Sequence, residues 1–263
     1  MRAQNYSSSG MTDMNVPKSL EIVLNRRSIR KFKSKPVPRK IINKIVKAGQ
    51  RAPTHCGMQA HSFILITDRK MKEQFFKIIG RQECMEQAPV WIMICADLAR
   101  QLELLRILGV ETEYGKVGKL LLCIIDAALA AENMTIAVEA YGLGSVFIGA
   151  VWEEMKKVSD ILELPNDVVP VVLLCFGFPN EAPPKRPRWP LKAVFHENTY
   201  RMPTTKEMKK YYEEANQKLL EMRYFDENIH SWAEHWQSKF QPEEMKEWEE
   251  KLRNDLRELG FLP

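Results

Sequence analysis

The sequence is poor in the features that stabilise small secreted or metal-dependent proteins. It contains an odd number of cysteines, and none belongs to a Cys-x-x-Cys pair; the five are Cys56, Cys84, Cys95, Cys123 and Cys175. So wide a spacing indicates neither a disulfide framework nor a zinc site. Residues 1–15 also lack the apolar stretch of a signal peptide. We therefore expect a protein of the reducing cytoplasm.

Long uncharged apolar runs and concentrated basic segments are missing as well. The most apolar stretch, 120–138, carries Asp126 and Glu132, so a membrane span is not expected. Lysine and arginine outnumber aspartate and glutamate by only 39 to 34, and nucleic-acid binding usually needs a clustered basic face. Hydrophobic residues make up 45% of the 263 residues, so we expect a soluble protein with a sizeable core.

Helix-like and strand-like segments alternate along the first 180 residues. Helices are predicted at 19–25, from Pro38 to about Gly49, at 116–141 and at 153–162, and strands at 61–67, 90–96, 168–176 and, as a strand or turn, 142–149. The segment 116–141 is apolar on most of its circumference, which predicts a central buried helix. The alternation indicates an α/β or α+β sandwich around one sheet.

The character of the sequence changes after residue 200. Thr204 and Glu207 form a T-x-x-E capping box, and apolar residues then recur at helical spacing as far as Met222. A last helix is predicted from about Pro242 to Gly260. We expect three parts: a flexible tail at 1–18, a domain at 19–202, and a charged, amphipathic helical extension at 203–263.

Two short basic segments are candidates for binding an anion. The first contains Arg26, Arg27, Ser28 and Arg30, and the second contains Arg186 and Arg188 in a proline-rich loop. A guanidinium group donates two parallel hydrogen bonds to a phosphate, and neighbouring prolines reduce the entropy lost when the loop is ordered. Each segment alone also fits a solvated surface turn. Our hypothesis is that the two converge on one phosphate.

The polar loop at 51–59 is a second candidate site. His55, Cys56 and His61 allow a metal site or a Cys–His nucleophile, but their spacing matches no standard zinc motif and no companion carboxylate or Asn is evident. We therefore expect no metal.

Three glycines downstream, Gly142, Gly144 and Gly149, do not have the G-x-G-x-x-G spacing of a dinucleotide-binding turn. They predict instead a close approach of the backbone to a flat ligand.

Taken in order, these segments resemble the FMN-dependent nitroreductase family. R-R-S-x-R-x-F is similar to the family's N-terminal flavin motif, and 52–59 is similar to its A-P-S-x-x-N-x-Q loop. The central helix with Asp126-Ala127-Ala128 leads into G-L-G-S at 142–145, and Ile148-Gly149, Gly177-Phe178-Pro179 and Arg186-x-Arg188 follow. The resemblance covers about residues 19–200. It implies an α+β fold with a central, mainly antiparallel sheet packed by helices.

The resemblance also implies the residues that bind FMN. Arg26, Arg27, Ser28, Arg186 and Arg188 would hold its phosphate and ribityl chain, Arg30 would lie by the pyrimidine, and Ile148 and Gly149 would border the ring, with the Gly149 amide at N5. Pro53, Thr54, His55 and Gly57 would reach the flavin of the partner in a homodimer. This chain departs from the family pattern at Gly57, where Asn is usual, and at Ala60-His61, where Pro-Trp is usual.

The activity implied is ping-pong hydride transfer from NADH or NADPH, through FMN, to a nitroaromatic, quinone or related small acceptor. No side chain need act as a nucleophile or acid, because the cofactor does the chemistry. Two alternatives stay open: a flavin-dependent dehalogenase or flavin-fragmenting enzyme on the same scaffold, and a non-catalytic flavin-binding or interaction protein. The extension is expected to pack on the opposite protomer; the alternative is that it folds back on its own subunit.

Overall fold

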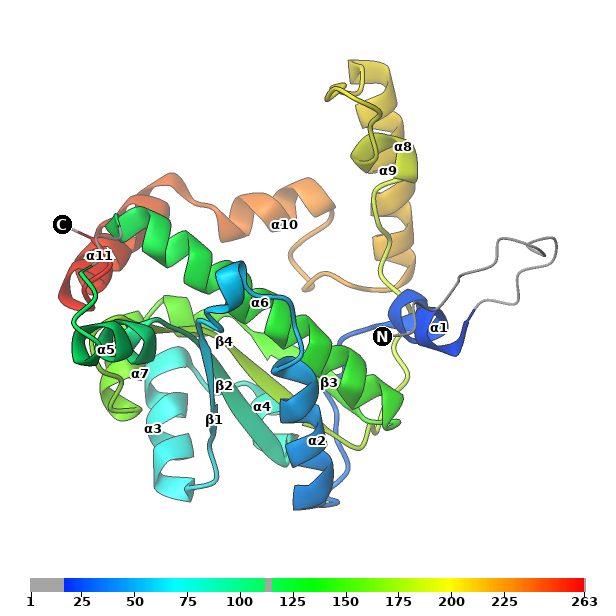
Figure 1. Cartoon of the computed structure of the whole chain (residues 1–263). Helices are drawn as coiled ribbons and strands as arrows, with labels where there is room; N and C mark the ends of the chain where they lie inside the picture. Colours follow the sequence, from blue (N-terminus) through cyan, green and yellow to red (C-terminus); the bar gives the residue numbers. More distant parts are fainter. Residues whose placement is uncertain (1–16, 112–114, 263) are drawn as a thin grey trace, which may run out of the picture.

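The computed structural model describes residues 17–111 and 115–262, and Figure 1 shows a sheet between helices with a helical unit projecting from one side. The sheet has four strands, β1 (His61–Leu65), β2 (Val90–Asp97), β3 (Gly144–Ile148) and β4 (Val168–Gly177). Their order is β1-β2-β4-β3, and every neighbouring pair is antiparallel. The expected α+β fold around a mainly antiparallel sheet is confirmed. The flexible tail expected at 1–18 lies, except for its last two residues, outside the described residues.

Helices cover both faces of the sheet. One face carries α2 (Arg39–Gly49) and α6 (Lys116–Ala140), and the other carries α3 (Arg69–Ile79), α4 (Glu83–Gln87) and α7 (Met155–Ile161). Along β2, Ile92 and Ile94 belong to the first core, whereas Trp91 and Met93 belong to the second. Because both faces of the sheet are covered, the central strands β2 and β4 have long apolar sequences without polar alternation.

A β-bulge explains a proline in the central strand β4. The register between β2 and β4 shifts between Ile94, which pairs with Val172, and Cys95, which pairs with Pro170. Proline has no N–H to give to a ladder, and bulges are among the few places where a sheet accepts it. The run predicted at 168–176 is therefore a strand despite its proline.

The helix α6 differs from the expectation of burial on most sides. Its inner face packs on β1 to β4, and residues such as Cys123, Ala127 and Met134 are fully buried. Its outer face carries an apolar stripe whose side chains are 42–57% exposed; these are Val117, Leu121, Ile125 and Leu129. Among the described residues it is the one helix long and apolar enough to cross a membrane, by length and composition only. None of the elements in the described part of the chain covers the stripe, which is why this side of the helix is exposed.

The segment that follows α1 (Lys18–Asn25) runs along the sheet. The Ile29 N–H donates to the Ser145 carbonyl at 2.9 Å, and the Lys33 N–H donates to the Phe178 carbonyl at 2.9 Å. A Cβ on Gly144 would lie 2.4 Å from Cγ1 of Ile29, so only glycine lets Ile29 pack there. The close approach expected at Gly144 is thus to the chain's own Ile29 and not to a flat ligand.

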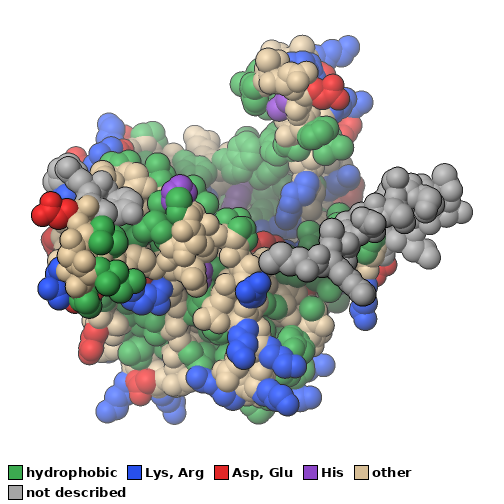
Figure 2. All heavy atoms as spheres, in the orientation of Figure 1, with side chains coloured by type: hydrophobic (Ala, Val, Ile, Leu, Met, Phe, Trp, Pro, Cys, Tyr) green, Lys and Arg blue, Asp and Glu red, His purple; other side chains and the backbone are tan. Residues whose placement is uncertain are grey.

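The expected C-terminal helices are present as α9 (Thr205–Glu221) and α11 (Pro242–Glu258), with α8 (Leu191–Val194) and α10 (Trp232–Lys239) beside them. Both bonds of the capping box at Thr204 and Glu207 form. The unit of α8 and α9 projects from the body and carries hydrophobic side chains on its surface (Figures 1 and 2). Several of these side chains are 60–73% exposed; they are Leu191, Val194, Phe195, Tyr200 and Met202.

The last helix corrects the expectation that the extension packs on the opposite protomer. Leu256, Leu259 and Phe261 are buried in the core of their own chain beside α6 and the sheet. Lys119 pairs with Asp167 and donates to the Gly260 carbonyl at 3.3 Å. The amphipathic stripe of α11 was visible in the sequence, but nothing in it specified which subunit the stripe would contact. Within the extension, the projecting unit keeps exposed apolar side chains that a partner could cover.

Candidate functional site

The two basic segments meet in one hollow of about 590 Å³. It is lined by seven cationic side chains and by no Asp or Glu among the described residues; the cations are Arg26, Arg27, Arg30, Lys185, Arg186, Arg188 and Arg223. Ser28 also lines it. We call this site the cation hollow. Six of the predicted FMN residues are thereby brought together.

Several neighbours hold Arg26 at the edge of the cation hollow. Its guanidinium lies 5.8 Å from the centre of the Phe147 ring, and its Nε lies 3.7 Å from a carboxylate oxygen of Glu132 on α6. Nε is buried and has no hydrogen-bond partner among the described residues. A buried donor without a partner is costly, so an acceptor from a ligand would stabilise this arrangement.

Burial and nearby positive charges both act on the pKa of Arg186. Burial lowers the pKa of Arg186, and the nearby guanidinium groups of Arg30 and Arg188 lower it further. Like charges held this close repel one another, and a bound dianion relieves the repulsion. The electrostatics of the cation hollow therefore fit a phosphate.

Glu181 fixes the backbone of the first basic segment from outside the cation hollow. One of its carboxylate oxygens accepts hydrogen bonds from the N–H groups of Arg30 and Lys31. Sequence reasoning missed this residue, since a single Glu in a loop carries no signal of such a contact. It also missed Met222, Arg223 and Tyr224, which line the cation hollow from the end of α9.

The second group of predicted residues lies elsewhere on the chain. Pro53, Thr54 and His55 line a different hollow, beside Ile125 and Leu129 of the exposed α6 stripe. Within one chain the structure therefore does not bring these residues to the arginines.

The loop 54–60 is held by a buried carboxylate on α6. Asp126 is 1% exposed and accepts hydrogen bonds from the N–H groups of His55, at 3.0 Å, and Ala60, at 3.1 Å. An acid within an apolar stretch of a helix is the sequence signal for such a partner, because a buried carboxylate needs hydrogen bonds. Gly57 in this loop has φ +70°, a conformation that strains any residue with a side chain. The glycine that replaces the family's Asn thus suits the backbone here.

Ile148 and Gly149 lie at the end of β3. Ile148 is buried, and Gly149 is exposed with open space where a Cβ would point. The ring of Phe147, the residue before Ile148, makes the cation–π contact with Arg26. The end of β3 therefore lies next to the cation hollow and leaves room for a ligand beside Gly149.

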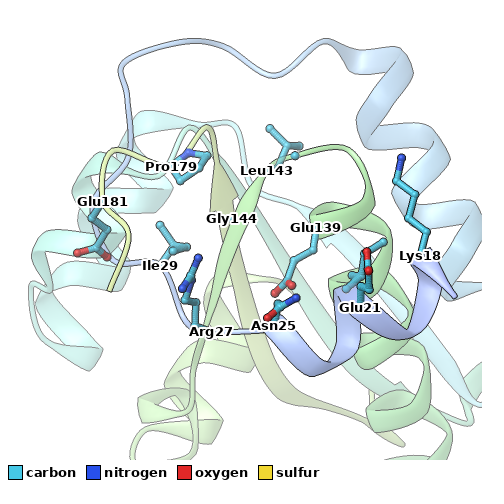
Figure 3. Close-up of a pocket in the computed structure, with 12 residues that line it drawn as sticks. Lys18, Glu21, Asn25, Arg27, Ile29, Glu139, Leu143, Gly144, Pro179 and Glu181 are labelled. Carbon is cyan, nitrogen blue, oxygen red and sulfur yellow. The ribbon is translucent and has the colours of Figure 1, made fainter. Parts of the chain in front are cut away.

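A second hollow, of about 370 Å³, shares Arg27 with the first (Figure 3). In that view Arg27 lies between Glu181 and Glu139. Burial raises the pKa of Glu139, and its Oε1 is buried without a hydrogen-bond partner. With Glu21 also in the lining, this second hollow is acidic on several sides and does not suit a phosphate.

The alternatives based on a metal or a Cys–His pair gain no support. No group of three or more His, Cys, Asp or Glu residues that could hold a metal forms in the described part of the chain. His55 and Cys56 are exposed, whereas His61 is 5% exposed. Burial lowers the pKa of His61, which favours its neutral form.

The comparison with known families agrees with the site. The model described as "Nitroreductase family" matches residues 23–82 and 76–178, and "Nitroreductase family, C-terminal domain" matches residues 186–263. The chain belongs to the nitroreductase family. The second match extends the likeness beyond residue 200, where the sequence comparison by motif had ended.

Individual relatives point to the same class. "FMN reductase (NADPH)" of Bacillus subtilis is 37% identical over 188 residues, 71% of this chain and 76% of the relative. "Oxygen-insensitive NADPH nitroreductase" of Salmonella typhimurium is 31% identical over 217 residues, 82% of this chain and 88% of the relative. The solved structure of the NfrA1 nitroreductase from Bacillus subtilis has a TM-score of 0.80 at 29% identity, and the match covers 90% of this chain and 98% of that one.

The family and the class of activity expected from the sequence, an FMN-dependent NAD(P)H oxidoreductase, are therefore confirmed. The role of each residue in the site is a separate question, to which the geometry contributes.

Proposed function

We propose that this chain acts as a homodimer that binds FMN in the cation hollow, oxidises NADH or NADPH, and reduces nitroaromatic, quinone or related small acceptors. The observation that carries the proposal is the meeting of seven cationic side chains, and no carboxylate among the described lining residues, in one hollow. Guanidinium groups in that number match a phosphate monoester. The names of the relatives support FMN as the cofactor and NADPH as a donor.

Each predicted residue has a task in this proposal. Arg26, Arg27, Ser28, Arg186 and Arg188 bind the phosphate and ribityl chain. Arg30 places a positive charge by the pyrimidine, and Ile148 and Gly149 border the ring. When bound, FMN supplies the chemistry, since it takes hydride from the nicotinamide and passes electrons to the acceptor. The protein's own residues bind and orient the cofactor.

The homodimer is supported by the stripe on α6. Val117, Leu121, Ile125 and Leu129 form a row of exposed apolar side chains on the central helix, and such a row indicates a protein interface. Pro53, Thr54 and His55 line a hollow with Ile125 and Leu129. A second copy packed on the stripe therefore meets this loop, together with Gly57 close by, and that is how the partner's cofactor is reached in the proposal.

The projecting unit supplies a second contact. Its exposed residues include Phe195, Tyr200 and Met202, and they need a surface to cover them. We assign them to the partner subunit, whereas α11 stays on its own chain.

We also assign the enzyme to the cytoplasm, where its nicotinamide donor is available. In the proposal, residues 19–202 form the domain and residues 203–263 form the extension.

Cofactor identity is the first test. Purified protein is expected to be yellow and to release FMN on denaturation, as measured by chromatography. Replacing Arg26 or Arg188 with Ala removes charge-assisted hydrogen bonds worth roughly 1.5–3 kcal/mol, which weakens FMN binding about 10- to 100-fold. Protein that binds no FMN on reconstitution refutes the proposal. Protein that binds FMN but does not oxidise NADH or NADPH is a binding protein without turnover.

The dimer has its own test. Leu121→Glu with Ile125→Glu places two charges in the stripe and is expected to yield monomers in analytical ultracentrifugation, with weaker FMN binding. Gln74→Glu, an exposed position on α3 at the opposite face of the sheet, is the matched control. A double variant that stays as dimeric as the control contradicts the interface.

A further inference from the structure

Tyr224 belongs to the C-terminal extension, yet it contacts an arginine of the cation hollow. The guanidinium carbon of Arg186 lies 4.3 Å from the centre of the Tyr224 ring. Nη1 of Arg186 also donates a hydrogen bond to the Tyr224 hydroxyl at 3.3 Å. Both residues line the cation hollow. The side chain that meets the phosphate in the proposed function is thus supported by a residue 38 positions later in the chain.

The end of α9 determines where Tyr224 lies. Arg223 has φ +49°, in the left-handed region, and it reverses the chain directly after the helix. The Tyr224 N–H then donates to the Leu219 carbonyl at 3.0 Å, the 6→1 bond of a Schellman cap. A residue other than glycine at such a position costs about 1 kcal/mol of backbone strain. The strained cap aims the ring at the cation hollow.

The back of the Tyr224 ring is packed against the extension itself. Its centre lies 5.3 Å from that of Phe225 and 5.5 Å from that of His235 on α10, both in edge-on geometry. The first turn of α10 is anchored to α9, because Asn216 Oδ1 accepts a hydrogen bond from the Trp232 N–H at 2.7 Å. Tyr224 is therefore held from behind by two helices and presents its face to Arg186.

Arg186 needs such a support. Its charge lies near those of Arg30 and Arg188, and without a bound anion a flexible arginine moves away from like charges into solvent. A cation over an aromatic face is attracted by the ring, and the contact also restricts the rotamers of the side chain. Ordering the arginine before the ligand arrives reduces the entropy lost on binding.

Resting on the proposed function, we propose that Tyr224 is a positioning residue for the FMN phosphate: it holds Arg186 in the cation hollow, so that the C-terminal extension forms part of the cofactor site. The hydrogen bond to the hydroxyl is long at 3.3 Å, whereas the ring face lies against the guanidinium group itself. The ring is therefore the essential part, and the hydroxyl hydrogen bond adds to it.

The test is the dissociation constant of the full-length protein for FMN, measured by quenching of flavin fluorescence. Tyr224→Leu keeps apolar bulk without a ring and is expected to weaken FMN binding roughly 10-fold, the loss that a desolvated cation–π contact represents. Tyr224→Phe keeps the ring and is expected to restore most of the affinity. Phe240→Leu, at an aromatic residue of the extension that is 65% exposed and does not line the cation hollow, is the control and is expected to leave the affinity for FMN unchanged.

Two further measurements separate positioning from a general structural role. Riboflavin lacks the phosphate, so its affinity should not respond to Tyr224→Leu. In an Arg186→Gln background, Tyr224→Leu should have no further effect on FMN binding, because the residue acts through Arg186. Three results would overturn the inference: equal losses of affinity for FMN and riboflavin, additive effects in the double variant, or an unchanged affinity for FMN in Tyr224→Leu. The proposed function does not depend on these results, because it is tested by FMN binding to the unsubstituted protein. If Tyr224→Leu does not fold, Tyr224→Phe and Arg186→Gln decide the question. The inference is overturned if Tyr224→Phe binds FMN as weakly as Arg186→Gln does.

Discussion

The substitution Asp126→Asn tests how the loop 54–60 is held. The two carboxylate oxygens of Asp126 accept hydrogen bonds from the His55 and Ala60 N–H groups inside the protein. Asp126→Asn keeps the size and shape but leaves one acceptor and puts an NH2 group where the other was. One buried N–H then loses its partner, and it faces a donor instead.

The size of the effect follows from these two bonds. A hydrogen bond to a charged group contributes about 1.5–3 kcal/mol, so Asp126→Asn should lower the free energy of unfolding by roughly 3 kcal/mol. For a chain of this length, 1 kcal/mol corresponds to about 2–4 °C in Tm, and the expected fall is therefore about 6–12 °C. Glu132→Gln is the matched control on the same helix. It removes only a half-exposed ion pair at 3.7 Å and should change Tm by about 2 °C or less.

Thermal unfolding followed by circular dichroism measures the loss, and hydrogen exchange of a peptide covering 52–61 locates it. The amides of His55 and Ala60 should exchange faster in Asp126→Asn than in Glu132→Gln. A Tm within 2 °C of the control, with unchanged exchange in that peptide, would show that the carboxylate does not hold the loop.

Three other outcomes are expected. Gly144→Ala puts a methyl group into Ile29 and should cost about 1–3 kcal/mol of stability in chemical denaturation, together with weaker FMN binding; a neutral effect would mean that the two segments are not packed as described. His61 has a pKa lowered by burial, so unfolding takes up a proton as pH falls below 6.5 and wild-type stability declines there. As the pH falls from 7.5 to 5.5, the Tm of His61→Gln should therefore fall less than the Tm of the wild type. Equal falls in the two proteins would contradict this. Lys119→Met leaves Asp167 without its cation and should lower the free energy of unfolding by about 2–4 kcal/mol, whereas adding Asp167→Leu should recover part of the loss.

Much of the fold could be predicted because its signals are local. The apolar runs of β2 and β4, the periodicity of α2 and the capping box of α9 each depend on a few consecutive residues, and all are present in the structure. Five helices were not predicted, because each has at most 11 residues of mixed polarity and gives no clear period; they are α3, α4, α5 (Ala99–Ile107), α8 and α10.

The residues of the site also differ in whether their signals in the sequence are local. The arginines at 26–30 and 186–188 were recognised because guanidinium groups in short motifs carry their own chemistry. The partners that hold them were not, because Glu132, Glu181 and Tyr224 act across long separations in the chain and look ordinary in isolation. The same limit applies to α11, whose stripe could equally have met the other subunit.

The position of Phe261 matters to a cell that makes this protein. Its side chain is fully buried in the core beside α6 and the sheet, so this part of the core stays open until residue 261 has been translated. A nascent chain of 250 residues already exposes the apolar surfaces of the sheet and of α6 that Leu259 and Phe261 later cover, and such surfaces promote aggregation. A stop codon placed just before Leu259 should therefore leave these surfaces uncovered, and chaperones should engage the nascent chain until Phe261 has been made.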